Sequence, residues 1–237
     1  MTHIERSDDV DAGLALRQWQ EYVSAMERRG WAIAEAPPAD DCPDGVFVED
    51  QVFVYGPLAV LCRAATPERR AEQHGLRGIL VAAGYRIVEI TAPGTLEGGD
   101  ILKHGSHVWV GVGGRTNEEG VRQLAAALAG FPLTVHRVPV TKVLHLKSAV
   151  TALPDGTVIG HPALVDDHTA WDGFLPVPEE PGSHVVLLGG HSVLMSAAAP
   201  RTAQLLRSRG LDVTVVDISE LEKLEGCVTC LSVRLRT

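Results

Sequence analysis

The chain has 237 residues, 45% of them hydrophobic and 22% charged, which is the balance of a globular protein with a buried core. Its formal net charge of −9 at pH 7 argues against nucleic-acid binding, because phosphate backbones are bound by clustered lysine and arginine. No apolar stretch approaches the roughly 20 residues of a membrane-spanning helix. We therefore expect a soluble protein with a small cationic molecule as partner, and with neither nucleic acid nor membrane as partner.

The amino-terminal residues 1–9, MTHIERSDD, are too polar for a secretory signal. The four cysteines are then expected to meet a reducing cytoplasm as thiols rather than to form a disulfide framework. The sequence thus predicts a cytoplasmic protein. It leaves the oligomeric state open, with a homodimer among the assemblies that fit.

A helical pattern over residues 9–30 and a strand pattern over residues 31–38 come first, with no hairpin before them. A pattern of strand, tight turn, strand, helix and strand then recurs over residues 46–90, 99–140, 148–179 and 184–218. In each copy a turn dipeptide separates two β-rich runs, and a helix with apolar spacing follows. In the first copy the opening strands are predicted over residues 46–55 and the helix within residues 66–84.

The last strand pattern covers residues 226–237, GCVTCLSVRLRT. Pairing it with the amino-terminal segment gives a fifth unit, which lacks its N-terminal strand. The sequence therefore predicts an α/β propeller of five ββαβ units with five-fold pseudosymmetry, folded as a single domain over residues 1–237. Loops at one end of the strands are expected to converge on a central channel.

Cys230 is the first candidate for chemistry, because a thiol can act as a nucleophile. A thiol at the start of a buried strand is also a common core residue. Cys227 completes a C-x-x-C pair that suggests a redox or zinc site. A thioredoxin-like pair should open a helix, whereas the following LSVRL has a strand pattern, and no second C-x-x-C completes a zinc ligand set. We expect neither a metal nor a disulfide here.

His145, in VLHLKS, has the side chain best suited to a general acid and base, although a core histidine is the alternative. Glu97 and Asp100 flank the pair Gly98-Gly99. Two glycines between carboxylates are typical of a plain turn, but glycine also permits close approach to the backbone. A carboxylate in that turn is therefore a candidate for orienting the imidazole.

Three further acidic residues and two arginines are candidates for ligand binding. Asp44, Glu49 and Asp50 lie in PDGVFVED, where they form either a solvated strand edge or a carboxylate site for a cation. Arg69 and Arg115 each begin a predicted helix, where the helix dipole disfavours a cation. Binding a ligand carboxylate is the functional explanation for these arginines, and a solvated side chain is the alternative.

Six of these stretches together resemble the dimethylarginine dimethylaminohydrolases, members of the guanidino-group-modifying superfamily that includes arginine deiminases and amidinotransferases. The matching stretches occur in the family's order across nearly the whole chain: PDGVFVED, TPERRAE, GTLEGGDIL, GGRTNEEG, KVLHLKS and LEGCVTCLSV. The resemblance implies the five-fold ββαβ propeller of that family, known as the pentein fold. It also implies hydrolysis of methylated arginines to citrulline through a covalent S-alkylthiouronium.

Carried over to this sequence, the resemblance makes Cys230 the nucleophile, His145 the general acid and base, and Glu97 its carboxylate partner. It makes Asp44, Glu49 and Asp50 the holders of the substrate's guanidinium or amino end. Six residues in all would bind substrate, the other three being Arg69 and Arg115 for the α-carboxylate and Leu224 for the amino group through its carbonyl. Such a route requires no cofactor and no metal, although zinc could bind Cys230 and His145 as an inhibitor.

Two alternatives to this activity remain open. The nearest is a related guanidine hydrolase acting on arginine or agmatine. Arginine deiminases usually carry an added helical domain, for which 237 residues leave no room, and agmatine lacks the carboxylate that Arg69 and Arg115 would bind. The other alternative is a non-catalytic binding protein built on the same propeller.

Overall fold

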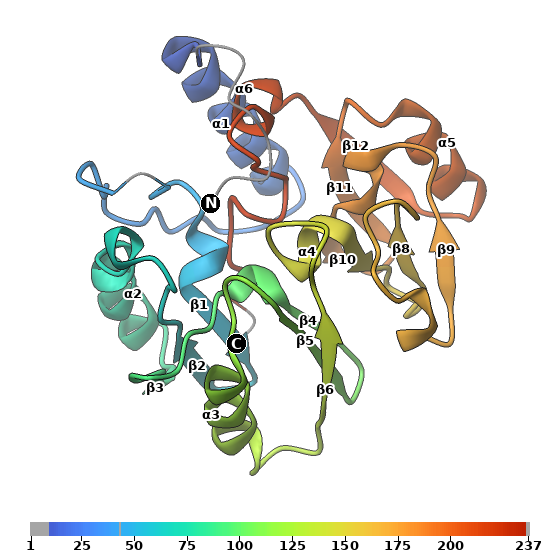
Figure 1. Ribbon diagram of the computed structural model, residues 1–237. Coiled ribbons are helices and arrows are strands. Elements are labelled where there is room, and N and C mark those ends of the chain that lie inside the picture. The colour runs from blue at the N-terminus through green and yellow to red at the C-terminus, as the bar shows by residue number, and fades with distance from the viewer. Residues whose placement is uncertain (1–9, 43, 236–237) are drawn as a thin grey trace. The chain divides into compact units, whose positions relative to one another are not determined.

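The computed structural model describes residues 10–42 and 44–235 of the chain (Figure 1). The chain divides into two compact units. Unit 1 comprises Met1–Ile33 and Ser148–Thr229, and unit 2 comprises Ala34–Lys147 and Cys230–Thr237. The single domain expected over residues 1–237 stays a prediction.

Each unit is built from the same repeated sheet. The described residues form four three-stranded sheets, in each of which an antiparallel hairpin is joined by a third, parallel strand. A parallel third strand needs a crossover, and a helix or helical turn supplies it in each sheet. This order confirms the ββαβ repeat predicted from the sequence.

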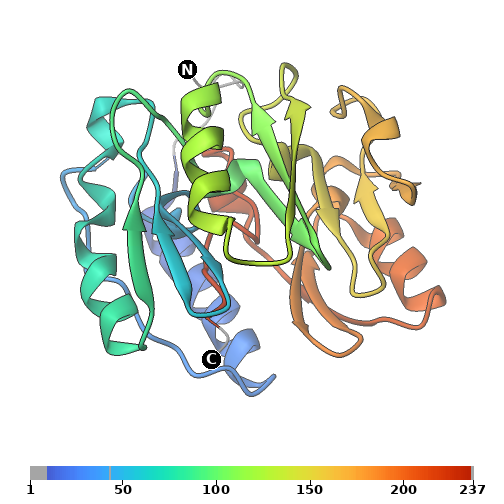
Figure 2. The same cartoon turned by 90° about the horizontal axis from the view of Figure 1, so that it is seen from below.

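Unit 2 contains the first two sheets (Figures 1 and 2). The first consists of β1 (Val52–Tyr55), β2 (Leu58–Leu61) and β3 (Arg86–Glu89), with α2 (Leu76–Ala82) before β3. The second consists of β4 (Ile101–His104), β5 (His107–Val112) and β6 (Thr134–Pro139), with α3 (Glu118–Leu128) before β6. The short helix α4 (Leu146–Ala149) follows β6.

Unit 1 contains the other two sheets and the first helix. Its sheets are β7 (Val150–Ala152), β8 (Val158–Gly160) and β9 (Phe174–Pro176), and β10 (Val185–Gly189), β11 (Ser192–Ser196) and β12 (Asp212–Val216). Its helices are α1 (Ala12–Glu27), α5 (Pro200–Ser208) and α6 (Ser219–Glu222). Along the described part of the chain, no helix combines the length and apolarity needed to cross a bilayer.

Helix α3 shows how local sequence positions the site. Asn117 caps the helix by accepting a hydrogen bond from the Gly120 amide at 2.8 Å. Val121, Leu124 and Leu128 recur on one face and are buried. A Cβ at Gly120 would lie 1.9 Å from the Thr95 carbonyl oxygen, so glycine is needed for this close approach.

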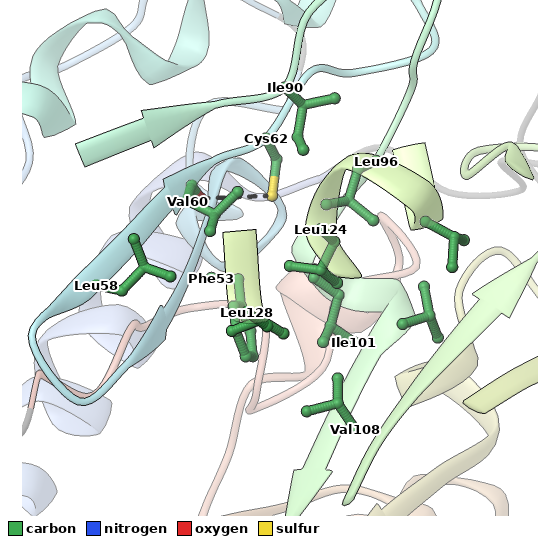
Figure 3. Packing of buried hydrophobic residues seen from close by; sticks show 12 residues of the cluster. Phe53, Leu58, Val60, Cys62, Ile90, Leu96, Ile101, Val108, Leu124 and Leu128 are labelled. Atoms are coloured by element: carbon green, nitrogen blue, oxygen red, sulfur yellow. Dashed lines mark hydrogen bonds between the residues drawn. The ribbon is translucent and has the colours of Figure 1, made fainter. Parts of the chain in front are cut away.

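The core of unit 2 holds the turn that carries Glu97. This core contains buried side chains of β1, β2, β4, β5 and α3, together with Leu96 and Ile101, which lie on either side of the turn (Figure 3). Both side chains are buried, which anchors the turn at its two ends. Truncating such a core leucine typically costs about 2–5 kcal/mol, so this turn is firmly held.

Cys62 points into the same core (Figure 3). Its thiol lies 3.9 Å from the Val60 carbonyl oxygen, and burial raises the pKa of the Cys62 thiol. A thiol that stays protonated is a poor nucleophile. Cys62 is therefore a packing residue.

Three predicted strands differ in the structure. Residues 46–50 were expected as a strand, but Val48–Gln51 form a 3-10 turn that buries the Glu49 and Asp50 carboxylates. No strand forms over residues 31–38, where Pro37 and Pro38 lack the amide hydrogens of a sheet ladder. The strand predicted over residues 226–237 does not form in the described residues 226–235, of which 228–231 are a turn, and residues 236–237 lie outside the described residues.

The helix expected within residues 66–84 is also shorter than predicted. Two 3-10 turns, Pro67–Arg69 and Glu72–Gly75, come before α2. At Gly75 a Cβ would lie 2.8 Å from Cδ of Pro37, so this segment packs closely against the chain before β1.

Candidate active site

A buried hydrogen bond joins His145 and Glu97 in unit 2. His145 Nε2 lies 2.7 Å from Glu97 Oε2, and both side chains are at most 4% exposed. Glu97 precedes the 3-10 turn Gly98–Asp100, and His145 precedes α4 rather than standing at the end of a strand. Two residues 48 positions apart are thus brought into contact by the loops after β3 and β6.

The charges around this pair favour the ion pair of imidazolium and carboxylate. Burial lowers the pKa of His145, but Asp50, Glu97 and Asp100 raise it more, to about 9. Burial raises the pKa of Glu97, but His145 and the arginines Arg69 and Arg115 bring it down to about 2. At neutral pH His145 therefore holds a proton that it can donate.

Asp100 positions the residue that follows His145. Its Oδ1 accepts a hydrogen bond from the Leu146 amide at 2.9 Å, and its Oδ2 accepts one from Thr116 Oγ1 at 2.6 Å. Complete burial raises the pKa of Asp100 to about 6. The sequence left Asp100 without a role beyond its turn and did not single out Thr116.

Gly98 and Gly99 allow two other segments to pack against their turn. These are the 3-10 turn Val48–Gln51 and the loop that carries His145. The Gly99 amide donates to Asp50 Oδ1 at 3.1 Å, and a Cβ there would lie 2.6 Å from that oxygen and 2.7 Å from the His145 ring. A Cβ at Gly98 would lie 2.0 Å from the Glu49 carbonyl oxygen. Glycine is required at both positions because the space is filled by residues of the site.

Arg69 lies inside the cluster of carboxylates. Its Nη2 contacts Asp50 Oδ2 and Glu72 Oε2, each at 3.0 Å, and its Nη1 lies 3.4 Å from Glu97 Oε2. Asp44 Oδ2 is 3.5 Å from Nε. Burial lowers the pKa of Arg69, but Asp50, Glu72 and Glu97 raise it overall. The predicted role in binding a substrate carboxylate stays a prediction, and the observed contacts are with carboxylates of the protein.

Glu72 was missed by the sequence analysis. It is buried, accepts from Arg69 Nε at 3.1 Å and from Gln51 Nε2 at 2.5 Å. Its spacing of three residues from Arg69 was a signal, because such pairs are neighbours on a helical turn.

Glu49 connects the 3-10 turn Val48–Gln51 to the carboxyl-terminal segment that contains Cys230 and Arg234. Its amide donates to the Cys230 carbonyl oxygen at 3.1 Å, and its Oε1 contacts Lys147 Nζ at 2.7 Å and Arg234 Nη2 at 3.4 Å. Its Oε2 is buried and has no hydrogen-bond partner among the described residues. Glu49 therefore retains an acceptor for a cationic group.

Cys230 lies in a turn over residues 228–231, not at the start of a strand, and is 9% exposed. All four cysteines fall within the described residues and are thiols.

Arg115 Nη1 lies 3.8 Å from Glu97 Oε1, on the opposite carboxylate oxygen from His145. Leu224 belongs to unit 1, in the turn after α6, and its contact with substrate stays a prediction.

One group of residues has the donor atoms of a metal site. Asp50, Glu97 and His145 offer ligand atoms within 4.8 Å of one another. Arg69 contacts both carboxylates and neutralises part of the negative charge that would have to balance a divalent ion. The arrangement is better suited to binding guanidinium, as it does with Arg69, than to binding a divalent ion.

Comparison with known proteins agrees with this geometry. Residues 34–185 match the sequence model of the family described as arginine deiminase. The chain is 56% identical over 236 residues to N(G),N(G)-dimethylarginine dimethylaminohydrolase of Streptomyces coelicolor, covering 100% of this chain and 91% of that protein. It is 34% identical to the enzyme of that name from Pseudomonas aeruginosa, covering 94% and 89%.

Solved structures point the same way. A dimethylarginine dimethylaminohydrolase variant, as an adduct with S-methyl-L-thiocitrulline, matches with a TM-score of 0.92 and 31% identity, covering 99% of this chain and 93% of that one. The Pseudomonas aeruginosa enzyme, as a cysteine-to-serine variant with citrulline, matches with a TM-score of 0.91 and 31% identity, with the same coverage. These likenesses confirm the predicted α/β pentein fold class. The chain belongs to the arginine deiminase family, and within it to the dimethylarginine dimethylaminohydrolases, which are hydrolases of the guanidino group.

Proposed function

We propose that this protein hydrolyses Nω-methylated arginines to citrulline, releasing dimethylamine from asymmetric dimethylarginine and methylamine from monomethylarginine. The observation that carries the proposal is the buried hydrogen bond of 2.7 Å between His145 and Glu97. It lies within a set of carboxylates that already binds one guanidinium, that of Arg69.

Guanidinium recognition follows from the acidic cluster. Asp50 accepts from Arg69 at 3.0 Å, so the same carboxylate is suited to a guanidinium of the substrate. Glu49 offers the buried acceptor Oε2. We assign Asp44, Glu49 and Asp50 to the guanidinium or amino end of the substrate, since a buried cation needs paired carboxylates.

The other end of the substrate carries a carboxylate. We assign the binding of this α-carboxylate to Arg69 and Arg115, and the binding of the substrate's amino group to the carbonyl oxygen of Leu224. Both arginines contact Glu97, so substrate binding is coupled to the carboxylate that holds His145. The assignment of Leu224 follows from family resemblance alone.

The reaction is proposed to begin with attack of the Cys230 thiolate on the central guanidinium carbon. A bound guanidinium favours the thiolate by its charge. The carbon–sulfur bond forms, and the methylated amine then leaves with the proton of the His145 imidazolium. This step leaves a covalent S-alkylthiouronium and a neutral imidazole.

Water completes the turnover. Neutral His145 takes a proton from water as the oxygen attacks the thiouronium carbon, and the carbon–sulfur bond breaks to give citrulline and the Cys230 thiolate. The second proton of the water passes to solvent, where the released amine takes it up. Glu97 keeps the imidazole oriented through both steps by its hydrogen bond to Nε2. All steps are accounted for by residues of this chain, so we propose a cofactor-independent and metal-independent route, with zinc as an inhibitor through Cys230 and His145.

The setting of the reaction is part of the same proposal. A nucleophilic thiol is retained in a reducing compartment, and all four cysteines, each among the described residues, are thiols. We propose a cytoplasmic enzyme whose partner is a small cationic amino acid, and no nucleic acid. A homodimer is the assembly to be tested by sedimentation.

An assay of substrates and amine products tests the function. Asymmetric dimethylarginine, monomethylarginine, arginine and agmatine are each incubated with the protein, and citrulline, methylated amines and ammonia are measured. We expect citrulline and dimethylamine in equal amounts from asymmetric dimethylarginine. Ammonia from arginine at a higher kcat/KM would instead assign an arginine deiminase activity, which the family match over residues 34–185 also suggests. No product from any of the four would overturn the proposal.

A further inference from the structure

Three histidines and a tryptophan lie on one face of the second sheet of unit 2, away from the catalytic cluster. In the register, His104 of β4 pairs with His107 of β5, and Trp109 of β5 pairs with His136 of β6. Residues two apart on a strand, and residues paired across strands, share a face of the sheet. The four side chains therefore lie together at the hairpin end of β4 and β5.

Two of the imidazoles are already in contact. His107 Nδ1 and His136 Nε2 are 2.8 Å apart, and the two ring centroids are 5.0 Å apart. Trp109 stacks beside both, at 5.4 Å from His107 and 5.5 Å from His136. His107 is exposed and His136 is half-buried, so the pair is open to a solute.

In this hydrogen bond the N–H of one ring points at the lone pair of the other, so both rings must turn before the two nitrogens can bind one metal ion. With metal–nitrogen bonds of about 2.0 Å, two nitrogens 2.8 Å apart subtend an angle of about 90° at the metal. This is the angle between neighbouring ligands in a square-planar or tetragonal site, the geometry of Cu²⁺ and Ni²⁺ with nitrogen ligands.

We propose that His107 Nδ1 and His136 Nε2 form a surface site for a divalent transition metal, with Cu²⁺ preferred. Copper forms the strongest complexes of the divalent first-row ions with a given nitrogen set. In the unbound pair, one neutral imidazole donates its N–H to the other. On binding, that proton moves to the other nitrogen of the same ring, and each ring then donates one lone pair to the metal.

The site is separate from the catalytic residues. Strand β4 runs from the Gly98–Asp100 turn at one end to His104 at the other, so the histidine pair lies at the opposite end of the strand from Glu97. Metal binding by the histidine pair and the hydrolase reaction can therefore be tested independently.

Copper titration tests the site. All proteins carry His3→Ala, Cys42→Ser and Cys230→Ser, because histidines and accessible thiols elsewhere in the chain also bind copper. In this parent we expect one equivalent of Cu²⁺ to quench tryptophan fluorescence and to give an electron paramagnetic resonance spectrum with nitrogen hyperfine splitting. Zn²⁺ should bind more weakly in competition.

The variants decide the outcome. His107→Ala and His136→Ala should each weaken Cu²⁺ binding at least tenfold, whereas His191→Ala, an exposed histidine in unit 1, should leave it unchanged. Trp109→Phe should keep the affinity but lose most of the quenching. Circular dichroism verifies that each variant is folded. Unchanged copper affinity in folded His107→Ala and His136→Ala, or a spectrum without nitrogen ligands, would overturn the proposal.

Discussion

His145 and Glu97 form a buried hydrogen bond in which Nε2 of the imidazole lies 2.7 Å from Oε2 of the carboxylate. Asp50 lies on the other side of the ring, with its Oδ1 3.7 Å from Nδ1. The imidazole is thus held between two carboxylates. This position explains why the pKa of His145 is raised to about 9 although burial alone lowers it.

Replacing Glu97 by glutamine should move the alkaline limit of activity. The amide keeps the shape but removes a charge that raises the pKa of His145, so the imidazole loses its proton at lower pH. We expect kcat to fall at least about 100-fold and the alkaline limb of the kcat/KM profile to move down by about one pH unit. Glu118→Gln, an exposed carboxylate on α3, serves as control. An unchanged alkaline limb in Glu97→Gln would show that Glu97 does not set this pKa.

The same pair predicts how stability depends on pH. The pKa of His145 is raised from 6.5 in the unfolded chain to about 9, so its stabilising contribution is complete below pH 6.5 and lost as pH rises through about 9. That contribution is on the order of 3 kcal/mol. Urea unfolding between pH 6.5 and 9.5 should show the decline, and His145→Gln should flatten it. Equal slopes in both proteins would contradict this account.

Gly99 offers a test of the close packing around His145. Gly99→Ala places a Cβ 2.6 Å from Asp50 Oδ1 and 2.7 Å from the His145 ring, so we expect a loss of about 2 kcal/mol and of most activity. Gly78→Ala in α2 is the matched control, because a Cβ there meets nothing within 4 Å. That control should stabilise the protein by about 0.5–1 kcal/mol. Equal stability changes in the two variants would refute the packing argument.

Asp100 should act as a positioning residue. Asp100→Asn removes the charge and disturbs the acceptor for Thr116, while a carbonyl oxygen can still accept from the Leu146 amide. Because burial raises the pKa of Asp100 to about 6, removing its charge should cost little stability. We expect kcat to fall about tenfold with KM within about twofold, and the His145 pKa to fall, since Asp100 helps to raise it. A rise in KM alone would assign Asp100 to substrate binding instead.

Motifs in the sequence predicted the central pair, because Glu97 and His145 lie in short stretches whose residue types suit one chemistry. The ββαβ repeat was also predictable, since turn dipeptides and apolar spacing recur. The 3-10 turn Val48–Gln51 was not predictable. Its alternating apolar residues have a strand pattern, whereas ion pairs with Lys147 and Arg69 fix Glu49 and Asp50 in the turn.

Arg69 illustrates what the sequence left undetermined. Its position beside a predicted helix start suggested binding of a ligand carboxylate, which stays a prediction, and its observed contacts are with carboxylates of the protein. Which carboxylates it would meet depends on packing between segments far apart in sequence, such as those carrying Asp50 and Glu97. Glu72 was overlooked because its role appears only when that packing is known.

The most direct test of the central claim is citrulline formation from asymmetric dimethylarginine by Cys230→Ser, measured beside wild type and Cys42→Ser. Cys42 is a partly exposed thiol in unit 2 that has no part in the proposed reaction. We predict turnover by wild type and Cys42→Ser, and none by Cys230→Ser although it still binds substrate in calorimetry. Citrulline formation by Cys230→Ser at a rate near that of wild type would contradict the account.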